Sequence, residues 1–455
     1  MNIKRTLLVF MSWLTICCGA LAQNAETLET VYQKKAFELF SEVLAGASDN
    51  VCFSPLSVQI VMSMVQNGAN NNTLRQMQDA LGTAAYSNEE VNAFNQQLCK
   101  VLTYRPPFTY NPMGWYTEEE QRAMYESYYP ICEMANGIWT RPGTVWHERF
   151  LQIMRDIYET DLGNVDFTTQ EGIDELNEWF NMKTHGLIPK VFEEPLSEDL
   201  AMLLANTLFF KGCWSVPFDN TLTKAGVFHC SDGSTVETDM MRTYGELYTT
   251  TTEKFRTVHL LYGYGDFSMT VFVPIEGIDL PALTYEDWEK ANRREEFVFT
   301  DLQMPSFVVE GKYELNDVLK RMGMEDAFIP SAADFSNMYD KALWIGRVFQ
   351  CSKIAVDEKG TEAAAVTVVE MYDSAIPDTP KPFTIDRPFY FTIEHRPTGS
   401  VMFVGRVTQL QGTASISQVT ERQQHDAVFD LQGRKLTGIP QKGIYIRNGK
   451  KYVAH

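Results

Sequence analysis

The chain contains few basic residues and few histidines. Among its 455 residues, 39 Lys and Arg stand against 59 Asp and Glu, which gives a formal charge of −20, and there are only seven histidines. An acidic chain repels phosphate backbones and anionic lipid surfaces, so we expect it to bind neither nucleic acid nor a membrane surface. The histidines are scattered without metal-ligand spacing, and we expect neither a metal nor a cofactor.

The local motifs of the common catalytic sites are also missing. There is no GxSxG turn, no HExxH pair, no GxxxxGK[ST] loop and no GxGxxG after a strand. A Ser-His-Asp triad could still assemble from distant segments, because triads do not depend on sequence order. Nothing local indicates one, so we expect a protein that is not an enzyme.

Long apolar runs are confined to the start of the chain, and no later run approaches the roughly 18 apolar residues of a transmembrane helix. Residues 1–22 are typical of an export signal, with Lys4 and Arg5 before an apolar stretch and Ala20-Leu21-Ala22 at its end. We expect cleavage there and an exported, soluble protein that is extracellular, at the cell surface or periplasmic.

Cysteine is sparse, and no pair has the CxxC spacing of a thiol-redox or zinc site. Cys17 and Cys18 lie in the export signal, where lipid attachment is the alternative to cleavage, although Ile16 is a poor neighbour for that processing. An oxidising compartment permits disulfides among the other six, and their pairing stays open. Cys52 and Cys351 lie in apolar surroundings and are expected to be small core residues.

Residues 23–410 alternate helical and strand patterns without a clear linker, which predicts one domain of mixed α and β structure. Helices are expected at 56–67 and 171–185, and strands at 201–210, 267–274, 389–393 and 399–407. A stretch at 104–129 is rich in aromatic residues and predicts a long ordered loop or insertion. Its rings either pack against their own domain or contact a partner.

The segment 411–455 differs from the rest and reads as a linker followed by a small β-hairpin. The apolar alternation at 444–447 and 450–453 flanks Asn448-Gly449, which suits a tight hairpin turn. This tail resembles the C-terminal β modules that Bacteroidetes-type secreted proteins use as sorting signals. A purely structural hairpin is the alternative.

The segment that follows the strand-like residues 354–356 is suited to two states. As a strand it places Thr361, Ala363, Ala365 and Thr367 on one face, all small and uncharged, so this face could be buried without stranding a charge. No proline interrupts residues 360–374, whereas Gly360 and the proline-containing exit suit an exposed loop. A permanent strand or an alanine-rich helical turn is the alternative. The segment considered for two states includes Glu358, Lys359, Gly360, Thr361, Glu362, Ala363, Ala364, Ala365, Val366 and Thr367.

Several spaced motifs resemble those of the serpin family, over roughly residues 25–410. The run DEKGTEAAA at 357–365 is similar to the serpin reactive-loop hinge almost letter for letter. The other matching motifs, in order, are NVCFSPLS from 50, ANTLFFKGCWSVPF from 205, LQMPSFVVEGKYEL from 302, DRPF from 386 and FVGRV from 403.

The resemblance implies an α+β serpin fold with a large central β-sheet A, two smaller sheets, eight to nine helices and an exposed reactive-centre loop. It also implies irreversible, suicide-type inhibition of a serine or cysteine endopeptidase. The protease cleaves the loop and forms a covalent acyl complex, and the hinge at 358–369 then inserts into the central sheet. A monomer is expected. The alternative is a non-inhibitory serpin-like binding protein that is cleaved as a substrate.

The customary loop length, counted from Glu358, puts the reactive bond at Ser374-Ala375, with Met371, Tyr372 and Asp373 as alternatives. Counting back from Pro388 instead gives the region of Pro377. No Arg or Lys occurs between Gly360 and Pro380, which argues against trypsin-like targets.

By the same resemblance, Ser54, Ser57 and Asn206 fall where the central sheet opens, and Trp214 falls where insertion begins. Gln350 stands where many serpins carry a histidine, and glutamine can both donate and accept hydrogen bonds. The region after Ala80, where some relatives bind heparin, offers only Lys100 and Arg105 nearby, so a polyanion partner is not expected.

Overall fold

The computed structural model describes residues 26–293, 295–361 and 379–410, together with four short strands of the tail. The export signal, the hinge from Glu362 onward and the predicted reactive bond lie outside the described residues.

Nine α-helices surround the sheets in the described part of the chain. They are α2 (Leu28–Leu44), α3 (Pro55–Gln66), α4 (Asn71–Leu81), α5 (Asn88–Leu102), α6 (Glu118–Tyr128), α7 (Glu148–Asp156), α8 (Gln170–Lys183), α9 (Tyr285–Arg293) and α10 (Asn316–Arg321). Local sequence sets several ends: Ser87 and Glu90 form a capping box at the start of α5, and Gly82 ends α4 in a left-handed conformation. The helices predicted at 56–67 and 171–185 are confirmed as α3 and α8.

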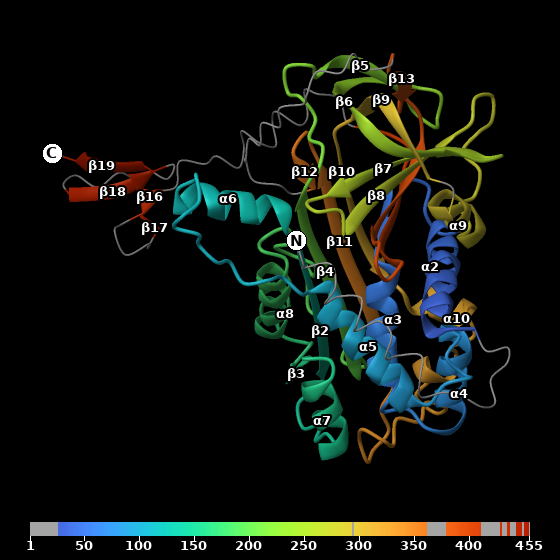
Figure 1. Cartoon of the computed structure of the whole chain (residues 1–455). Coiled ribbons are helices and arrows are strands. Elements are labelled where there is room, and N and C mark those ends of the chain that lie inside the picture. The colour runs from blue at the N-terminus through green and yellow to red at the C-terminus, as the bar shows by residue number, and fades with distance from the viewer. Residues whose placement is uncertain are drawn as a thin grey trace.

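A six-stranded sheet runs through the molecule, with α8 on one face and α3 on the other (Figure 1). Its strands, in spatial order, are β10 (Phe307–Glu314), β11 (Arg347–Val356), β12 (Gly360–Thr361), β4 (Met202–Cys213), β2 (Ile131–Thr140) and β3 (Asp161–Asn164). The short β12 lies between β11 and β4 at one end of the sheet, whereas β11 and β4 pair directly in parallel at the other.

The other strands of the body form a nine-stranded assembly. They are β1 (Val51–Phe53), β5 (Lys224–His229), β6 (Thr235–Thr251), β7 (Phe255–Tyr262), β8 (Phe267–Pro274), β9 (Glu296–Pro305), β13 (Lys381–Thr384), β14 (Phe389–His395) and β15 (Ser400–Val407). The two smaller sheets implied by the resemblance are linked through the long β6, which pairs with β5 and β9 and, at its end, with β7. The α+β fold class is confirmed.

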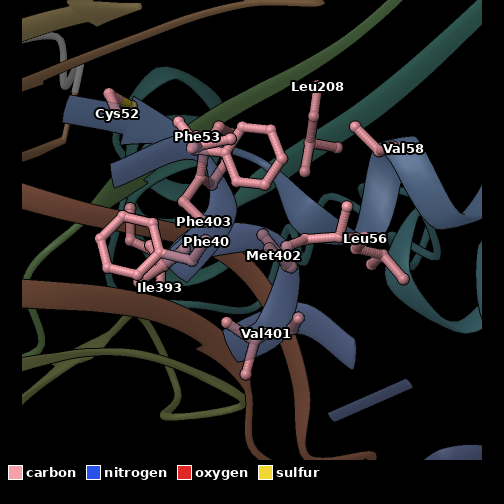
Figure 2. Packing of buried hydrophobic residues seen from close by; sticks show 14 of the residues in the cluster. Phe40, Cys52, Phe53, Leu56, Val58, Leu208, Ile393, Val401, Met402 and Phe403 are labelled. Carbon is pink, nitrogen blue, oxygen red and sulfur yellow. The ribbon is translucent and has the colours of Figure 1, made fainter. Parts of the chain in front are cut away.

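The main core fills the space between the two sheets around α3. All twelve residues of α3 are buried, as expected for a helix that is surrounded on every side. Figure 2 shows Leu56 of this helix among Phe53, Met402 and Phe403 of the neighbouring strands β1 and β15. The N-terminus of α3 is therefore packed against β1 and β15 of the nine-stranded assembly.

The six cysteines of the body are all free thiols, so none of them forms a disulfide. Cys52 and Cys351 are fully buried, which confirms the expectation that they are core residues. No group of ligand side chains suited to a metal occurs among the described residues. Within the same residues, no helix is both long and apolar enough to cross a membrane.

The tail forms a small sheet of its own. β18 (Gly443–Arg447) and β19 (Lys450–Ala454) pair antiparallel, which confirms the hairpin. Two strands that the sequence did not predict, β16 (Val428–Phe429) and β17 (Lys435–Leu436), join it. The linker lies outside the described residues, and the sorting role of the tail stays a prediction.

Candidate functional site

The chain reverses direction immediately after β11, in a turn that we call the hinge turn (residues 357–360). Val356 and Thr361 pair across it. The Asp357 N–H donates to the carbonyl oxygen of Gly360 at 3.0 Å, and one Asp357 carboxylate oxygen accepts from the N–H groups of Lys359 and Gly360 at 2.8 and 3.1 Å. An aspartate that caps its own turn in this way fixes the direction in which the next residues leave.

The segment that follows β4 forms hydrogen bonds with the backbone of the hinge turn. The indole nitrogen of Trp214 donates to the Asp357 carbonyl oxygen at 2.9 Å, and its backbone N–H donates to the Lys359 carbonyl oxygen at 2.8 Å. The Phe218 N–H donates to the carbonyl oxygen of Glu358 at 2.9 Å. Trp214 therefore lies against the start of the hinge.

The side chain of Glu358 is held separately, because the hydroxyl of Thr223 donates to its carboxylate at 2.8 Å. This contact keeps the charge outside the sheet while the chain passes inward.

Thr361 is the first hinge residue whose side chain enters the interior. It is fully buried, and its hydroxyl lies 2.6 Å from the hydroxyl of Tyr262. Tyr262 is also fully buried; its ring stacks on Trp214 with centroids 4.4 Å apart and meets the edge of Phe210. Burial raises the pKa of Tyr262, so its phenol stays neutral. The environment of Thr361 is closed and uncharged.

Gly360 passes so close to β4 that only glycine fits. A Cβ atom at this position would lie 2.0 Å from the carbonyl oxygen of Gly212. The glycine that the sequence alone associated with loop mobility is thus required for the contact between β12 and β4.

Burial raises the pKa of the Asp357 carboxyl group, even though the two backbone N–H donors of the hinge turn oppose the change. The ionised form is therefore less favourable in the folded protein than in the unfolded chain. The Asp357 carboxylate therefore has two opposite effects on the hinge turn. Its oxygen accepts the two N–H groups that hold the turn, but burial of its negative charge is unfavourable.

Beyond the hinge turn, β11 and β4 come together. Their direct parallel pairing covers five residue pairs, from Arg347–Leu203 to Cys351–Thr207. The sheet is therefore closed along one half of these strands and divided by β12 at the other end.

A cluster of buried polar side chains, which we call the latch, lies beneath the closed half. The Gln350 amide nitrogen donates to the Ser54 carbonyl oxygen at 2.6 Å and to the Ser57 hydroxyl at 2.7 Å. Its amide oxygen accepts from the Ser54 N–H at 3.1 Å, and the Ser54 hydroxyl donates to the Met402 carbonyl oxygen at 2.7 Å. The latch ties β11 to the N-terminus of α3.

Asn206 lies directly opposite Gln350 in the pairing of β4 with β11. Its amide nitrogen donates to Asn136 of β2 at 2.5 Å. Its amide oxygen is buried and finds no donor among the described residues, and neither does the hydroxyl of Thr207. A buried polar group that lacks a partner costs about 1–3 kcal/mol compared with one that is hydrogen-bonded.

The structure thus brings Ser54, Ser57, Asn206 and Gln350 together and places Trp214 with the hinge turn. Sequence reasoning missed Tyr262, Thr223 and Asn136. Each is an ordinary residue of a strand or loop far from the hinge in sequence, and only the pairing of the strands reveals its contact.

Replacing Gln350 should weaken the latch. In Gln350→Ala, the Ser54 N–H loses its buried acceptor and the Ser57 hydroxyl loses the donor of one of its two bonds, which should lower the free energy of unfolding by about 1–3 kcal/mol. Urea unfolding measures this loss. Gln152→Ala, at an exposed position, should stay within about 0.5 kcal/mol of wild type, and equal midpoints for both variants would show that the latch contributes nothing.

The hinge turn should respond to the charge of Asp357. A raised pKa in the folded state means that the carboxyl group's contribution to stability is present at acid pH and is lost as pH rises through the folded pKa. Asp357→Asn keeps an acceptor oxygen without the charge, so it should raise Tm slightly at pH 7, with the difference shrinking as pH falls towards 4. Asp199→Asn, at an exposed position, is the control. A lower Tm for Asp357→Asn at pH 7 would contradict the argument.

Comparison with known proteins agrees with this geometry. The family model for serpins, serine protease inhibitors, matches residues 31–410. A rice serpin, Serpin-ZXA, is 31% identical over 386 residues, which cover 80% of this chain and 90% of the relative.

Solved structures are similar over most of the chain. The thermophilic serpin Tengpin in its native state is 28% identical, with a TM-score of 0.73, over 86% of this chain and 96% of that one. Thyroxine-binding globulin in complex with thyroxine is similar in fold, with a TM-score of 0.72 at 24% identity, over 84% of this chain and 99% of that one. The chain belongs to the serpin family of serine protease inhibitors.

Proposed function

We propose that this chain traps a serine or cysteine endopeptidase irreversibly. The protease cleaves near residues 371–375 and forms an acyl complex, and residues 358–369 then insert between β11 and β4. The inhibitor supplies no catalytic residue. As the sequence predicts, the chain acts after export, as a monomer and without a polyanion partner.

The observation that carries this proposal is the position of the hinge. Gly360 and Thr361 already pair with β4, and Thr361 pairs with β11, as the first residues of an antiparallel strand between two parallel neighbours. A loop that was merely exposed would not need a glycine fitted to Gly212 or a buried threonine.

The register of β12 indicates what further insertion requires. Continued past Thr361, residues 362–365 would extend between the strands up to the directly paired half. Val366 would then meet the first direct pair, Cys351 and Thr207, and the following residues would replace the five direct pairs one by one. Insertion therefore has to open the latch.

The two faces of the inserted strand suit their surroundings. Ala363, Ala365 and Thr367 would follow Thr361 towards the main core, on the side where Phe210 lies, and none of them carries a charge.

On the opposite face, Val366 would lie beside the buried Cys351. Glu362 and Glu370, towards the two ends, would fall beside Lys211 and Arg347, which are only partly buried. The carboxylates would therefore meet cations rather than the interior.

Insertion should release free energy, because an internal strand bonds both neighbours. Nine further residues, 362–370, would gain more backbone hydrogen bonds than the direct β11–β4 pairing loses. A net gain of roughly ten bonds at about 1 kcal/mol each is on the order of 10 kcal/mol. This is comparable with the whole stability of many domains.

A non-inhibitory binding protein is the second candidate, since the same fold occurs in thyroxine-binding globulin. The two functions differ in the fate of the cleaved chain: an inhibitor stays attached to the protease, and a substrate does not. The neutral hinge face supports inhibition, and the lack of Arg and Lys between Gly360 and Pro380 supports a target that is not trypsin-like.

Trapping should depend on Thr361. Wild type incubated with chymotrypsin, elastase and subtilisin should give a complex that survives denaturing electrophoresis, and mass spectrometry should locate the cut within 371–375. Thr361→Arg should be cleaved without forming the complex, because the closed site beside Tyr262 cannot hold a charge. Thr361→Ser keeps a small hydroxyl and should still trap. Equal trapping by the Arg variant would refute the role of the hinge.

Cleavage alone should stabilise the protein. If a catalytic amount of a protease that wild type does not trap nicks the loop and the hinge inserts, Tm should rise by about 10–20 °C. Calorimetry on nicked and intact samples measures the difference. Nicked Thr361→Arg should show little increase, and an unchanged Tm for nicked wild type would favour the binding-protein alternative.

A further inference from the structure

The aromatic stretch between α5 and β2, residues 103–129, which we call the insertion, has an inner and an outer part. In the inner part, Tyr128 stacks on Tyr264 with centroids 4.6 Å apart, and Tyr125 meets Phe108 at 5.6 Å. Arg122 lies over the Phe108 ring at 4.3 Å. These rings pack on their own domain, as one of the two sequence alternatives expected.

The outer part exposes large apolar side chains that lie close together in the sequence. Trp115 is 100% exposed and Met113 is 91% exposed, with Tyr110 and Tyr116 exposed beside them. Single exposed apolar residues are normal on a protein surface, but a cluster with a fully exposed tryptophan indicates an interaction site.

Polar contacts hold this cluster in position. The Gln121 side chain accepts from the Asn111 N–H at 2.9 Å and donates to the carbonyl oxygens of Asn111 and Tyr116 at 2.9 and 2.8 Å. Thr117 and Glu120 form a capping box at the start of α6. The backbone that carries Met113 and Trp115 is thus fixed by hydrogen bonds before and after it in the sequence. This reduces the conformational entropy lost when a partner binds.

The insertion is joined to the place where the hinge enters the sheet. The Tyr264 N–H donates to the Tyr128 carbonyl oxygen at 3.2 Å, and the Gly263 N–H donates to the Cys213 carbonyl oxygen at 2.9 Å. Cys213 in turn pairs with Gly360. Figure 1 shows α6 leaving this end of the sheet, and its eleven residues extend about 16 Å.

The charge around the cluster is negative. Glu118 and Glu119 lie three and four residues after Trp115 and are exposed. Arg122, the one cation of α6, pairs with Glu118 at 3.2 Å. With a chain charge of −20, this surface favours a partner with an apolar groove and a cationic rim.

We propose that Met113, Trp115 and Tyr116 form a second docking surface for the target protease, which presents a cationic surface beside its active site. This inference rests on the proposed function, because the loop must hold the protease near the insertion. Ser374 lies thirteen residues after Thr361, and the chain between them spans at most about 45 Å. A protease of roughly 230 residues has a radius of gyration of about 17 Å, so one molecule can contact the loop and the insertion together.

The test compares Met113→Ser/Trp115→Ser with wild type. The probe is whichever of chymotrypsin, elastase and subtilisin wild type traps fastest. The variant should form the complex at least tenfold more slowly at an unchanged stoichiometry, and its Kd for the same protease with the active-site serine inactivated should weaken by a similar factor. Val145→Ser and Met182→Ser, which are 75% and 59% exposed elsewhere on the surface, are the matched controls.

Charge is tested separately. Glu118→Gln/Glu119→Gln should reduce the salt dependence of the association rate, because two negative charges are removed from the docking surface.

Each outcome decides one question. Equal rates and equal Kd for wild type and the apolar double variant overturn the docking surface while leaving the trapping function intact. A variant that changes the sedimentation coefficient of the inhibitor but not the rate shows a contact between two copies, and also overturns it. If wild type traps none of the three proteases, the proposed function fails, and this inference fails with it.

Discussion

The backbone groups that face each other across β11 and β4 are the constraint on which this molecule depends. Every buried N–H and carbonyl group there needs a partner. Along the five direct pairs, the backbone groups of β11 and β4 bond to each other. At the other end, these strands pair with Gly360 and Thr361 instead. The proposed insertion would complete the same strands in a second way, starting from Gly360 and Thr361.

Two sets of polar contacts hold this arrangement, and they differ in how they respond to protonation. The hinge turn relies on the Asp357 carboxylate, and burial disfavours the charged form of this group. The latch relies on Gln350, which donates and accepts without any charge. Where the resemblance places a histidine in many serpins, a glutamine cannot titrate near neutral pH. Opening of the latch in this chain should therefore not follow the protonation of a latch side chain.

The sequence could predict what depends on neighbours along the chain. Alternation placed Thr361 on a face that can be buried, and Asn448-Gly449 between two alternating runs predicted the hairpin of β18 and β19. It could not predict the pocket of Thr361, because Tyr262 becomes its partner only when β7 and β4 meet. Nor could the sequence tell which aromatic residues of the insertion are packed and which are exposed. Tyr128 is packed because Tyr264 lies beside it, whereas Trp115 is fully exposed.

If this chain traps proteases as proposed, a docking surface on it has to bind weakly enough to release the protease. If the inserting hinge carries the protease away from its first position, every contact made at the insertion must break. Burying two side chains such as Met113 and Trp115 contributes about 3–6 kcal/mol at most, and less after the costs of association. Strand insertion, on the order of 10 kcal/mol, exceeds this. The surface can therefore speed the encounter without preventing the movement, whereas a broad apolar interface would hold the protease where it first bound.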